Sequence, residues 1–559
     1  MNAVICMLHS KYIHSALAPW YLLAGVCAHG DRGITAEVAE GTVNMDIQVA
    51  AELVVSKKPQ VVGLCCYIWN ISYIKKLLPI LKASLPEAVI ILGGPEVSFN
   101  PSDVLRELPL ADFVISGEGE APFAYLLNAI YAGLDGTDIP GVCYRTGGVP
   151  VIKAPHCPQA IPPSPYCEAY FKALCGRIAY LETSRGCPFN CAFCLSGRDA
   201  RVRFFPLERA KQELVLLANS GTQTVKLVDR TFNADRQRAR EIFSFIIKNY
   251  GTLIPRRVCF HFEIAGDLLD DETLALVKTA PSGLIQFEIG LQSFHAETLE
   301  ALDRKTDITR LKSNIERLMS FGNIHIHVDL IAGLPQEDRP RFAESFNTAY
   351  ALGPHMLQLG FLKLLHGAAM REDPARFPCA YSAQPPYTVT ATPWLTTSEL
   401  NRLHAVEAVL DRLYNSGRFR RSLTYVLERT DKTPFELFWD AGGFMAPKLK
   451  TGVSLDDLTA ITFEYFLGLG GVDKAALRDS MVCDRMATNA SGKLPSSLRV
   501  SDKRLKSAAL ELERGFLKKT TKVGRGYALL YSENVIVRAD YGEKDPVTGT
   551  YPITKYPLP

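Results

Sequence analysis

Three of the chain's fourteen cysteines lie within eight residues of one another, and their spacing limits what the chain can bind more than any other feature. Cys187, Cys191 and Cys194 form a C-x3-C-x2-C set inside the segment TSRGCPFNCAFCLSGR. Thiolates this close in sequence can bind one soft metal centre. A structural zinc site and an ordinary [4Fe–4S] cluster each require four protein ligands. Three ligands leave one iron open, and this suits a cluster that binds a substrate or cofactor there.

Two other interpretations of these cysteines stay open on spacing alone. They are three buried cysteines without a metal, or a zinc site that Cys175 or a distant histidine completes. Gly186, Pro188 and Asn190 lie among the cysteines and are typical of a loop rather than of a packed helix or strand. A loop that carries three thiols favours the metal centre.

The composition is that of a globular protein with several domains. The chain has 559 residues, of which 47% are hydrophobic and 22% charged, and its net charge of +3 favours no class of partner. No run of about 18 apolar residues occurs, and the N-terminus lacks a basic segment followed by an apolar one, so we expect no leader and no membrane partner. The irregular cysteine spacing differs from that of a secreted disulfide framework and favours a reducing, cytoplasmic location.

Residues 1–145 alternate short apolar segments with amphipathic ones. Continuous apolar strands separated by helices of about 10 to 15 residues predict a parallel, doubly wound, Rossmann-like sheet. Ligands bind to such α/β sheets at the carboxyl ends of the strands. We expect strands at 3–8, 61–67, 88–94 and 111–116, and helices at 17–29, 71–85 and after the glycine turn that begins at 117.

Two glycine-rich loops follow strands of this expected sheet, GGPE at 93–96 and GEGE at 117–120. Glycine lets the backbone approach a ligand closely, so both loops can border a large, flat cofactor. Neither loop is a G-x-G-x-x-G, which disfavours a dinucleotide. Plain strand-to-helix connections are the alternative explanation for these glycines.

Residues 146–178 are expected to be a linker between domains. The segment holds six prolines, which prevent a continuous helix and favour an extended chain. Its cysteines, Cys157, Cys167 and Cys175, are irregularly spaced, so we interpret them as structural, with a second metal cluster as the alternative.

Residues 179–370 repeat a strand and a helix about every 30 to 40 residues. Six strand–helix units in series predict a parallel barrel, whose site lies at the carboxyl ends of the strands. The cysteine loop leaves the first of these strands, and polar residues follow the others. The expected strands lie at 178–184, 224–233, 258–267, 284–293, 324–335 and 356–365.

Residues 371–559 are expected to form a mostly helical C-terminal domain with a β-rich end. Helices are predicted at 395–419, 435–447 and 453–470, and strands within 526–542. The segment from Asp484 to Arg525 contains eleven Lys or Arg residues and four Asp or Glu residues. This excess can bind a phosphate-rich partner such as RNA. A solvated helix face explains much of this excess without a ligand, and we favour that explanation.

On these features the sequence resembles the radical S-adenosylmethionine (SAM) superfamily. Its members hold a [4Fe–4S] cluster by C-x3-C-x2-C with an aromatic residue before the last cysteine, and Phe193 occupies that position. The resemblance implies that Cys187, Cys191 and Cys194 bind three irons and that SAM binds the fourth. It also implies that the barrel of residues 179–370 has the partial (βα)6 form of this superfamily.

The resemblance further implies SAM contacts at the ends of the barrel strands. The family binds the SAM amino group after the second strand, where its common Gly-Gly-Glu is here replaced by Asp229-Arg230-Thr231. Taken singly, each carboxylate in this set is better explained as a salt-bridged loop residue, but their recurrence at successive strand ends favours ligand contacts. The implied contacts are Phe193, Asp229, Arg230, Thr231, Glu263, Glu288, Gln292, Ile331 and Gly333.

The N-terminal domain resembles the cobalamin-binding domain that precedes many radical SAM barrels, on the strength of GGPEVSFNP and GEGE. The D-x-H-x-x-G string, whose histidine ligates cobalt in many cobalamin domains, does not occur in the sequence. We therefore expect cobalamin without a histidine ligand and interpret His9 and His14 as ordinary loop residues. The implied cobalamin contacts are Tyr67, Ile68, Trp69, Gly93, Gly94, Pro95, Glu96, Ser98, Ser116, Gly117, Glu118 and Gly119.

The C-terminal part resembles a domain of unknown function, DUF4080, found in a subgroup of these proteins. Together the resemblances imply a cobalamin-dependent radical SAM methyltransferase that acts on an unreactive carbon, with the cofactors supplying the difficult chemistry. An external one-electron donor such as flavodoxin or ferredoxin is then expected. The alternatives are a radical rearrangement or cyclisation, an RNA-modifying enzyme, and a non-enzymatic cobalamin or redox sensor. The sequence identifies neither a catalytic residue nor the substrate.

Overall fold

The computed structural model describes residues 1–198, 201–449, 452–516 and 526–558. The chain divides into two compact units, each built from several segments. Residues 363–390 therefore pack with the N-terminal part of the chain rather than with their sequence neighbours. The first unit contains Met1–Ile264, Leu302–Arg304 and Lys363–Thr390, and the second contains Ala265–Ala301, Lys305–Leu362 and Ala391–Pro559.

A seven-stranded sheet forms the N-terminal part of the first unit. Its order is β2-β1-β3-β4-β5-β6-β7, with β1 to β5 parallel and β6 and β7 antiparallel at one edge. The predicted doubly wound sheet is confirmed, and its topological switch point lies between β1 and β3. The strands are β1 (Asn2–His9), β2 (Thr35–Thr42), β3 (Val61–Cys65), β4 (Val89–Gly93), β5 (Phe113–Ile115), β6 (Val142–Thr146) and β7 (Val149–Val151). The helices are α1 (Ala18–His29), α2 (Ile47–Val55), α3 (Ile71–Ser84), α4 (Pro95–Ser98), α5 (Pro101–Glu107) and α6 (Glu120–Tyr131).

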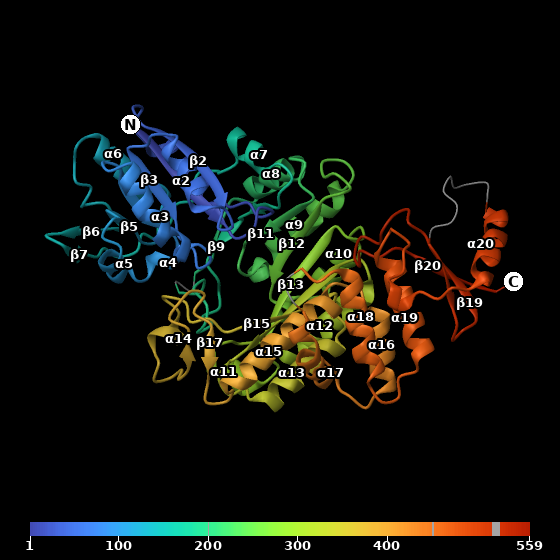
Figure 1. The fold of residues 1–559 in the computed structure, drawn as a ribbon. Coiled ribbons are helices and arrows are strands. Elements are labelled where there is room, and N and C mark those ends of the chain that lie inside the picture. Colours follow the sequence, from blue (N-terminus) through green and yellow to red (C-terminus); the bar gives the residue numbers. More distant parts are fainter. Residues whose placement is uncertain (199–200, 450–451, 517–525, 559) are drawn as a thin grey trace. The chain divides into compact units, whose positions relative to one another are not determined.

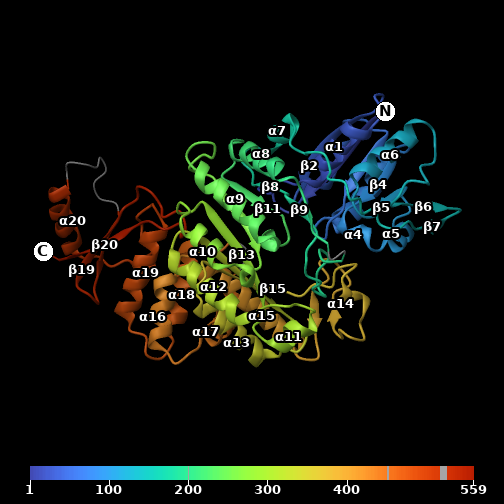
Figure 2. The same cartoon turned by 180° about the vertical axis from the view of Figure 1, so that it is seen from behind.

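Helices cover both faces of this sheet because its central strands are apolar on both sides. Along β1, Val4 and Leu8 join the core beneath α2 and α3, whereas Ile5 and Met7 join the core beneath α1 and α6. The two cores alternate along the strand, as side chains of a β-strand must. Figure 1 shows α2 and α3 over one face, and Figure 2 shows α1 and α6 over the other.

Six parallel strands, each followed by helical structure, make up the predicted barrel segment. In the first unit β11 pairs with β8 and β12, and in the second unit β14 pairs with β13 and β15. Along β13 buried and half-buried residues alternate, so one face packs on helices and the other carries the polar residues. The strands are β8 (Ala179–Leu181), β11 (Thr224–Leu227), β12 (Cys259–Ile264), β13 (Ile285–Gln292), β14 (His325–Ala332) and β15 (Met356–Phe361). The helices are α8 (Leu207–Ala218), α9 (Arg236–Asn249), α10 (Asp271–Lys278), α11 (Ala296–Ala301), α12 (Ile308–Phe321), α13 (Arg339–Ala351) and α14 (Ala369–Glu372).

The predicted linker and C-terminal domain also have defined structure. The linker contains one short helix, α7 (Glu168–Leu174), and its three cysteines are exposed. An antiparallel sheet of β18 (Tyr527–Leu530), β19 (Val535–Ala539) and β20 (Ile553–Pro557) follows the C-terminal helices. Of the predicted basic segment, Lys518, Lys519, Lys522 and Arg525 lie outside the described residues. The helices are α15 (Thr397–Leu410), α16 (Arg420–Arg429), α17 (Pro434–Met445), α18 (Leu455–Leu467), α19 (Lys474–Thr488) and α20 (Lys503–Phe516).

None of the helices described is long and apolar enough to cross a membrane.

Candidate active site

The three cysteines lie in the loop that leaves β8, as the sequence predicts. Cys187 and Cys191 are buried, Cys194 is half-buried, and all three thiols are free. Ala192 fixes the loop through two backbone hydrogen bonds: its N–H donates to Leu302 O at 2.9 Å, and its C=O accepts from Met370 N–H at 3.0 Å. The loop is therefore held by two segments of the first unit that are remote in sequence.

Each thiol in this loop has a polar neighbour. Arg304 Nη1 lies 3.7 Å from Cys191 Sγ, Ser196 N–H donates to Cys194 Sγ at 3.4 Å, and Cys187 Sγ lies 3.3 Å from Thr231 Oγ1. Burial raises the pKa of the Cys191 thiol, whereas the charge of Arg304 and its hydrogen bond lower this pKa. Metal-bound cysteines are thiolates, which such donors stabilise. The residues present therefore fit an iron–sulfur cluster that three thiolates hold.

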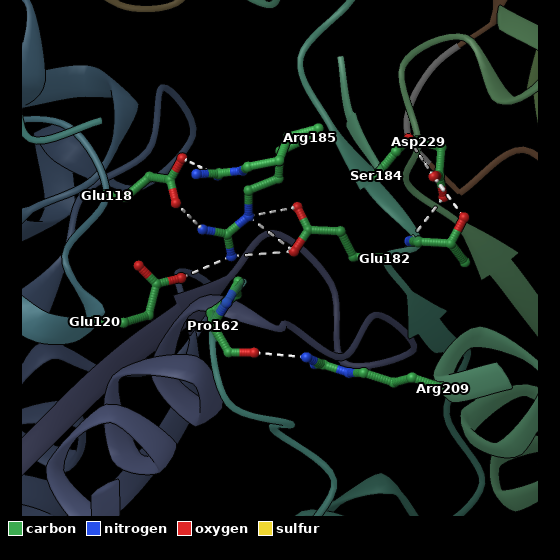
Figure 3. A network of polar contacts seen from close by, with 10 residues as sticks. Glu118, Glu120, Pro162, Glu182, Ser184, Arg185, Arg209 and Asp229 are labelled. Carbon is green, nitrogen blue, oxygen red and sulfur yellow. Dashed lines mark hydrogen bonds and ion pairs between the residues drawn. The ribbon is translucent and has the colours of Figure 1, made fainter. Parts of the chain in front are cut away.

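Asp229 is fully buried and anchors the start of the cysteine loop. Its carboxylate accepts hydrogen bonds from Thr183 N–H at 3.1 Å, from Thr183 Oγ1 at 2.8 Å and from the Ser184 hydroxyl (Figure 3). Burial raises the pKa of Asp229 to about 6, against the opposing effect of these donors. Of its two neighbours in the predicted SAM set, Arg230 is exposed and Thr231 touches Cys187. The structure thus uses Asp229 to position the loop.

A network of ion pairs links the GEGE loop to the cysteine loop. Arg185 donates to Glu118 at 2.5 Å, to Glu120 at 2.6 Å and to Glu182 at 3.0 Å, and its side chain is only 16% exposed (Figure 3). Arg203 pairs with the second oxygen of the Glu118 carboxylate. Two guanidinium groups therefore neutralise most of the charge of three carboxylates, which come from the predicted cobalamin loop and from the segment that leads into the cysteine loop.

The glycine loops at the ends of β4 and β5 run close to other backbone. Gly94 has φ +115°, and a Cβ there would lie 2.4 Å from Cys66 O. Gly117 has φ +89°, and a Cβ there would lie 2.3 Å from His156 O. The loops are joined because Gly117 N–H donates to Ser98 Oγ at 3.1 Å and the Ser116 hydroxyl donates to Ser98 O. Only glycine fits these two positions without a backbone shift.

Glu96 in the first glycine loop is buried against the 363–390 segment. Its carboxylate accepts a hydrogen bond from the Tyr387 hydroxyl. Burial raises the pKa of Glu96, and the bond from Tyr387 partly opposes this rise. Arg371 lies over the Tyr387 ring at 4.6 Å, and Phe99 packs against Gly367. The same segment holds Ala192, so it contacts both the predicted cobalamin loop and the cysteine loop.

Aromatic residues follow β3 at the switch point of the sheet. The rings of Tyr67 and Trp69 stack with their centroids 4.4 Å apart, and the Trp69 indole N–H donates to Leu8 O at 3.1 Å. Trp69 is 43% exposed. His9 Nε2 lies 2.9 Å from Glu40 Oε1 and from Arg177 Nη2, and His14 Nδ1 lies 2.8 Å from Tyr180 Oη. Both histidines are thus engaged with protein groups.

The remaining predicted SAM contacts lie along or after later barrel strands. In the first unit Glu263 forms an ion pair with Lys226 at 3.4 Å. In the second unit Glu288 Oε2 lies 3.9 Å from His327 Nδ1. Gln292 has φ +67°, and its buried Oε1 accepts no hydrogen bond among the described residues. An unsatisfied buried amide oxygen is costly without a partner, so this position suits a ligand donor.

Other residues of the predicted sets take the following places. Tyr67, Ile68, Gly93, Gly119, Phe193 and Ile331 are half-buried, Pro95 is exposed, and Gly333 is buried with φ +93°. Sequence reasoning missed Arg304, Arg185 and Tyr387. Arg185 stands next to the cysteine motif and could have been singled out by its charge. Arg304 and Tyr387 reach the site only through tertiary contacts.

Three family models match successive parts of the chain. Residues 4–127 match the B12 binding domain, residues 181–349 the radical SAM superfamily, and residues 375–523 a protein family of unknown function, DUF4080. The chain is therefore a radical SAM protein with a B12-binding domain before its barrel. The match to DUF4080 follows the match to the radical SAM superfamily along the chain. Both the resemblance and the cofactors inferred from it, cobalamin, SAM and an iron–sulfur cluster, are confirmed by these matches.

Curated relatives and solved structures resemble large parts of the chain. "Cobalamin-dependent radical SAM methyltransferase TokK" of Streptomyces tokunonensis is 30% identical over 326 residues, which are 55% of this chain and 47% of TokK. "Anaerobic magnesium-protoporphyrin IX monomethyl ester cyclase" of Rubrivivax gelatinosus is 28% identical over 323 residues, 55% of this chain and 56% of the cyclase. The chain thus spans about half the length of these relatives.

The structural likeness concerns the fold. The "cobalamin-dependent S-adenosylmethionine radical enzyme OxsB" has a TM-score of 0.61 at 13% identity, over 93% of this chain and 81% of OxsB. The "radical S-adenosylmethionine methyltransferase, TsrM" of Kitasatospora setae has a TM-score of 0.56 at 16% identity, over 68% of this chain and 76% of TsrM. With the family matches, they confirm the predicted fold class: a doubly wound cobalamin-binding domain, a partial (βα)6 barrel and a mostly helical C-terminal domain.

Proposed function

We propose that the chain is an enzyme that transfers a methyl group from SAM to an unactivated carbon in a cobalamin-dependent radical reaction. One observation carries the proposal. The loop with three free thiols and the glycine loops of the B12-binding domain lie in one compact unit, and Arg185 joins them through Glu118 and Glu120. The similarity to TokK, a methyltransferase by its name, supports methyl transfer over other radical chemistry.

The protein groups would hold the cofactors and exclude water, because the cofactors do the difficult chemistry. Bound cluster, SAM and cobalamin supply a radical and a transferable methyl group. Cys187, Cys191 and Cys194 would hold the cluster as thiolates, with Arg304 offsetting part of their negative charge. The loops at Gly94 and Gly117 would lie along the corrin, and Trp69 would cover the adjoining end of β3.

A product-ratio measurement tests methyl transfer before the substrate is known. The full-length chain, reconstituted without oxygen, is incubated with a reductant, SAM and metabolite fractions from the cells that make it. Radical methylation consumes two SAM molecules, so S-adenosylhomocysteine and 5′-deoxyadenosine should rise together in about a one-to-one ratio in the active fraction. Fraction-dependent 5′-deoxyadenosine without S-adenosylhomocysteine would refute methyl transfer and leave radical chemistry standing.

A radical cyclisation without methyl transfer is the second candidate. The observation that favours it is the similarity to the cyclase of Rubrivivax gelatinosus, over about the same share of this chain as TokK covers. Both reactions would use the same cysteine loop. The ratio of the two SAM products separates them, as described above.

We infer that the electrons come from an external one-electron donor such as flavodoxin or ferredoxin, since the described chain contains one cysteine set of the required spacing. The fourteen cysteines, whose irregular spacing differs from that of a secreted disulfide framework, support a reducing, cytoplasmic setting. RNA is the less favoured substrate class. Salt-sensitive binding of RNA through the basic segment between Asp484 and Arg525 would support it.

A further inference from the structure

A cavity of about 520 Å³, broadly open to solvent, lies in the second unit, where α13, α15 and α17 meet. Its lining includes Arg339, Arg402, Trp439 and Gly443. All four lie outside the sets assigned above to cobalamin, SAM and the cluster, and three of them lie in the region that matches DUF4080. The volume is within the range of small-molecule sites in proteins.

Two guanidinium groups converge on one indole ring in this cavity. The Cζ atoms of Arg339 and Arg402 lie 5.5 Å and 5.6 Å from the Trp439 ring centroid. Within the described part of the chain, neither arginine has a carboxylate at ion-pair distance, and the buried Nε of Arg402 has no hydrogen-bond partner. Arg339 is exposed and Arg402 is half-buried, so an anion with acceptor oxygens can approach both guanidinium groups from solvent.

The glycine pair in α17 explains how Arg402 is held. Glycine inside a helix costs about 1 kcal/mol relative to alanine, so two in succession need a reason. A Cβ on Gly442 would lie 3.1 Å from the backbone of Ala405, which accounts for Gly442 by the close packing of α15. A Cβ on Gly443 would meet both terminal nitrogens of Arg402 at 2.1 Å. The absence of a side chain at Gly443 therefore leaves room for the Arg402 guanidinium over α17.

The rest of the lining adds positive potential and an apolar wall. Arg339 begins α13, and Ser398 and Glu399 lie in the first turn of α15, so two helix N-termini border the cavity. The one carboxylate in the lining, Glu399, accepts hydrogen bonds from the Thr396 N–H and hydroxyl in a capping box. Ala405, Ala446 and Pro447 supply the apolar wall.

We propose that Arg339, Arg402 and Trp439 form a binding site for a small molecule that carries a phosphate monoester. A phosphate monoester has two negative charges and three free oxygens, which match two guanidinium groups, whereas one carboxylate satisfies one guanidinium. The apolar wall receives the organic part of the ligand. The site is independent of the proposed methyl transfer.

Calorimetric titration of the full-length, reconstituted protein tests the site with three probes: inorganic phosphate, adenosine 5′-monophosphate, and a single-stranded RNA oligonucleotide without terminal phosphates. We expect saturable binding of the first two, with the nucleotide tighter. Arg402→Gln should weaken both by about tenfold or more, the expected effect of losing one charge-assisted contact. Arg429→Gln is the matched control, because Arg429 also lies over a ring, that of Tyr425, but does not line the cavity.

Gly443→Ala separates a role in binding from a role in folding. Alanine raises helix propensity and preserves the charge, while its methyl group displaces the Arg402 guanidinium. The variant should keep the melting temperature of the wild type and still lose phosphate affinity. Unchanged affinity in both Arg402→Gln and Gly443→Ala, or no saturable binding of either phosphate probe, would overturn the proposal. If the RNA binds more tightly than both phosphate probes and this binding is lost in Arg402→Gln, the ligand is a nucleic-acid backbone and not a phosphate monoester.

Discussion

Arg185 forms ion pairs with three carboxylates beside the cysteine loop. It is largely buried and contacts Glu118, Glu120 and Glu182, so its removal takes an ion-pair partner from three carboxylates, of which Glu118 keeps Arg203. Uncompensated buried charge is strongly destabilising. We expect Arg185→Gln to lower the free energy of unfolding by about 2 to 4 kcal/mol, measured by denaturant titration.

The control for Arg185 is Arg198→Gln in the same loop. Arg198 pairs with Glu372, and the two side chains are 37% and 49% exposed. Exposed pairs contribute at most about 1 kcal/mol, so this variant should be close to wild type. Equal effects of the two substitutions would show that the Arg185 network does not hold the loops together.

The buried carboxyl of Glu337 should make the free energy of unfolding depend on pH. It lies buried in the second unit, accepts hydrogen bonds from the Ser293 and Ser345 hydroxyls, and burial raises its pKa from 4.5 to about 7. As the pH rises, the Glu337 carboxyl loses its proton at a lower pH in the unfolded chain than in the folded chain. Its titration therefore lowers the free energy of unfolding progressively between about pH 4.5 and 7, and no further above pH 7.

Glu337→Gln removes that titration while keeping an acceptor for the two hydroxyls. Relative to wild type, the variant should gain stability between pH 4.5 and pH 7, by up to about 3 kcal/mol. Melting curves of both proteins at the two pH values measure the difference. A stability difference that does not change with pH would contradict the raised pKa.

The hydroxyl of Tyr387 tests how the 363–390 segment supports the first glycine loop. Tyr387→Phe leaves the buried Glu96 carboxyl without its donor, at a cost of about 1 to 3 kcal/mol, and should also reduce the cobalamin retained on purification. Tyr381→Phe is the control, since Tyr381 also lies near Arg371 but is 39% exposed. If Tyr387→Phe retains as much cobalamin as Tyr381→Phe, the contact has no part in positioning the loop.

At the scale of the elements, the turn after β4 depends on glycine. Gly94→Ala must adopt φ +115° and push against Cys66 O, so we expect a loss of more than about 2 kcal/mol and little bound cobalamin. Gly147→Ala has a positive φ of 57° but open space around the Cβ, and it should cost about 1 kcal/mol. Absorbance of bound cobalamin and denaturant titration report both effects. Gly94→Ala with wild-type cobalamin content would exclude a close approach at this turn.

The elements that sequence reasoning predicted well are the buried ones. Strands such as β3 and β4 are continuous apolar runs, and they form within a few residues of the expected positions. Sequence reasoning missed β2, whose sequence TAEVAEGT is half-exposed at the sheet edge, and the helix that follows it, α2. An edge strand with glutamates and a glycine has too little apolar character for its pattern to stand out.

The candidate site divides in the same way. The roles of the cysteines and glycines depend on local spacing and backbone conformation, so they could be predicted from the sequence. The partners of Asp229, Glu96 and Glu118 are tertiary, and the sequence could place these carboxylates at strand ends without showing that protein groups satisfy them. Arg304 belongs to a segment remote from Cys191 in sequence and gave no signal at all.

For the whole molecule, the arrangement of segments matters more than their order. The first unit takes in residues 302–304 and 363–390, so the cysteine loop, the B12-binding domain and these returning segments form one body. Its hydrogen bonds tie Ala192 to Leu302 and Met370. A truncation of the chain before residue 363 would therefore remove support from the cofactor loops themselves.

Reductive cleavage of SAM tests the central claim most directly. The full-length chain, reconstituted without oxygen, should contain about four irons and release 5′-deoxyadenosine when a strong reductant and SAM are added. Cys191→Ala should lose both the cluster and the cleavage while retaining cobalamin, since the B12-binding loops do not include this residue. A wild-type chain that holds the cluster and cobalamin but releases no 5′-deoxyadenosine, or a Cys191→Ala chain that cleaves SAM as fast as wild type, would contradict the account.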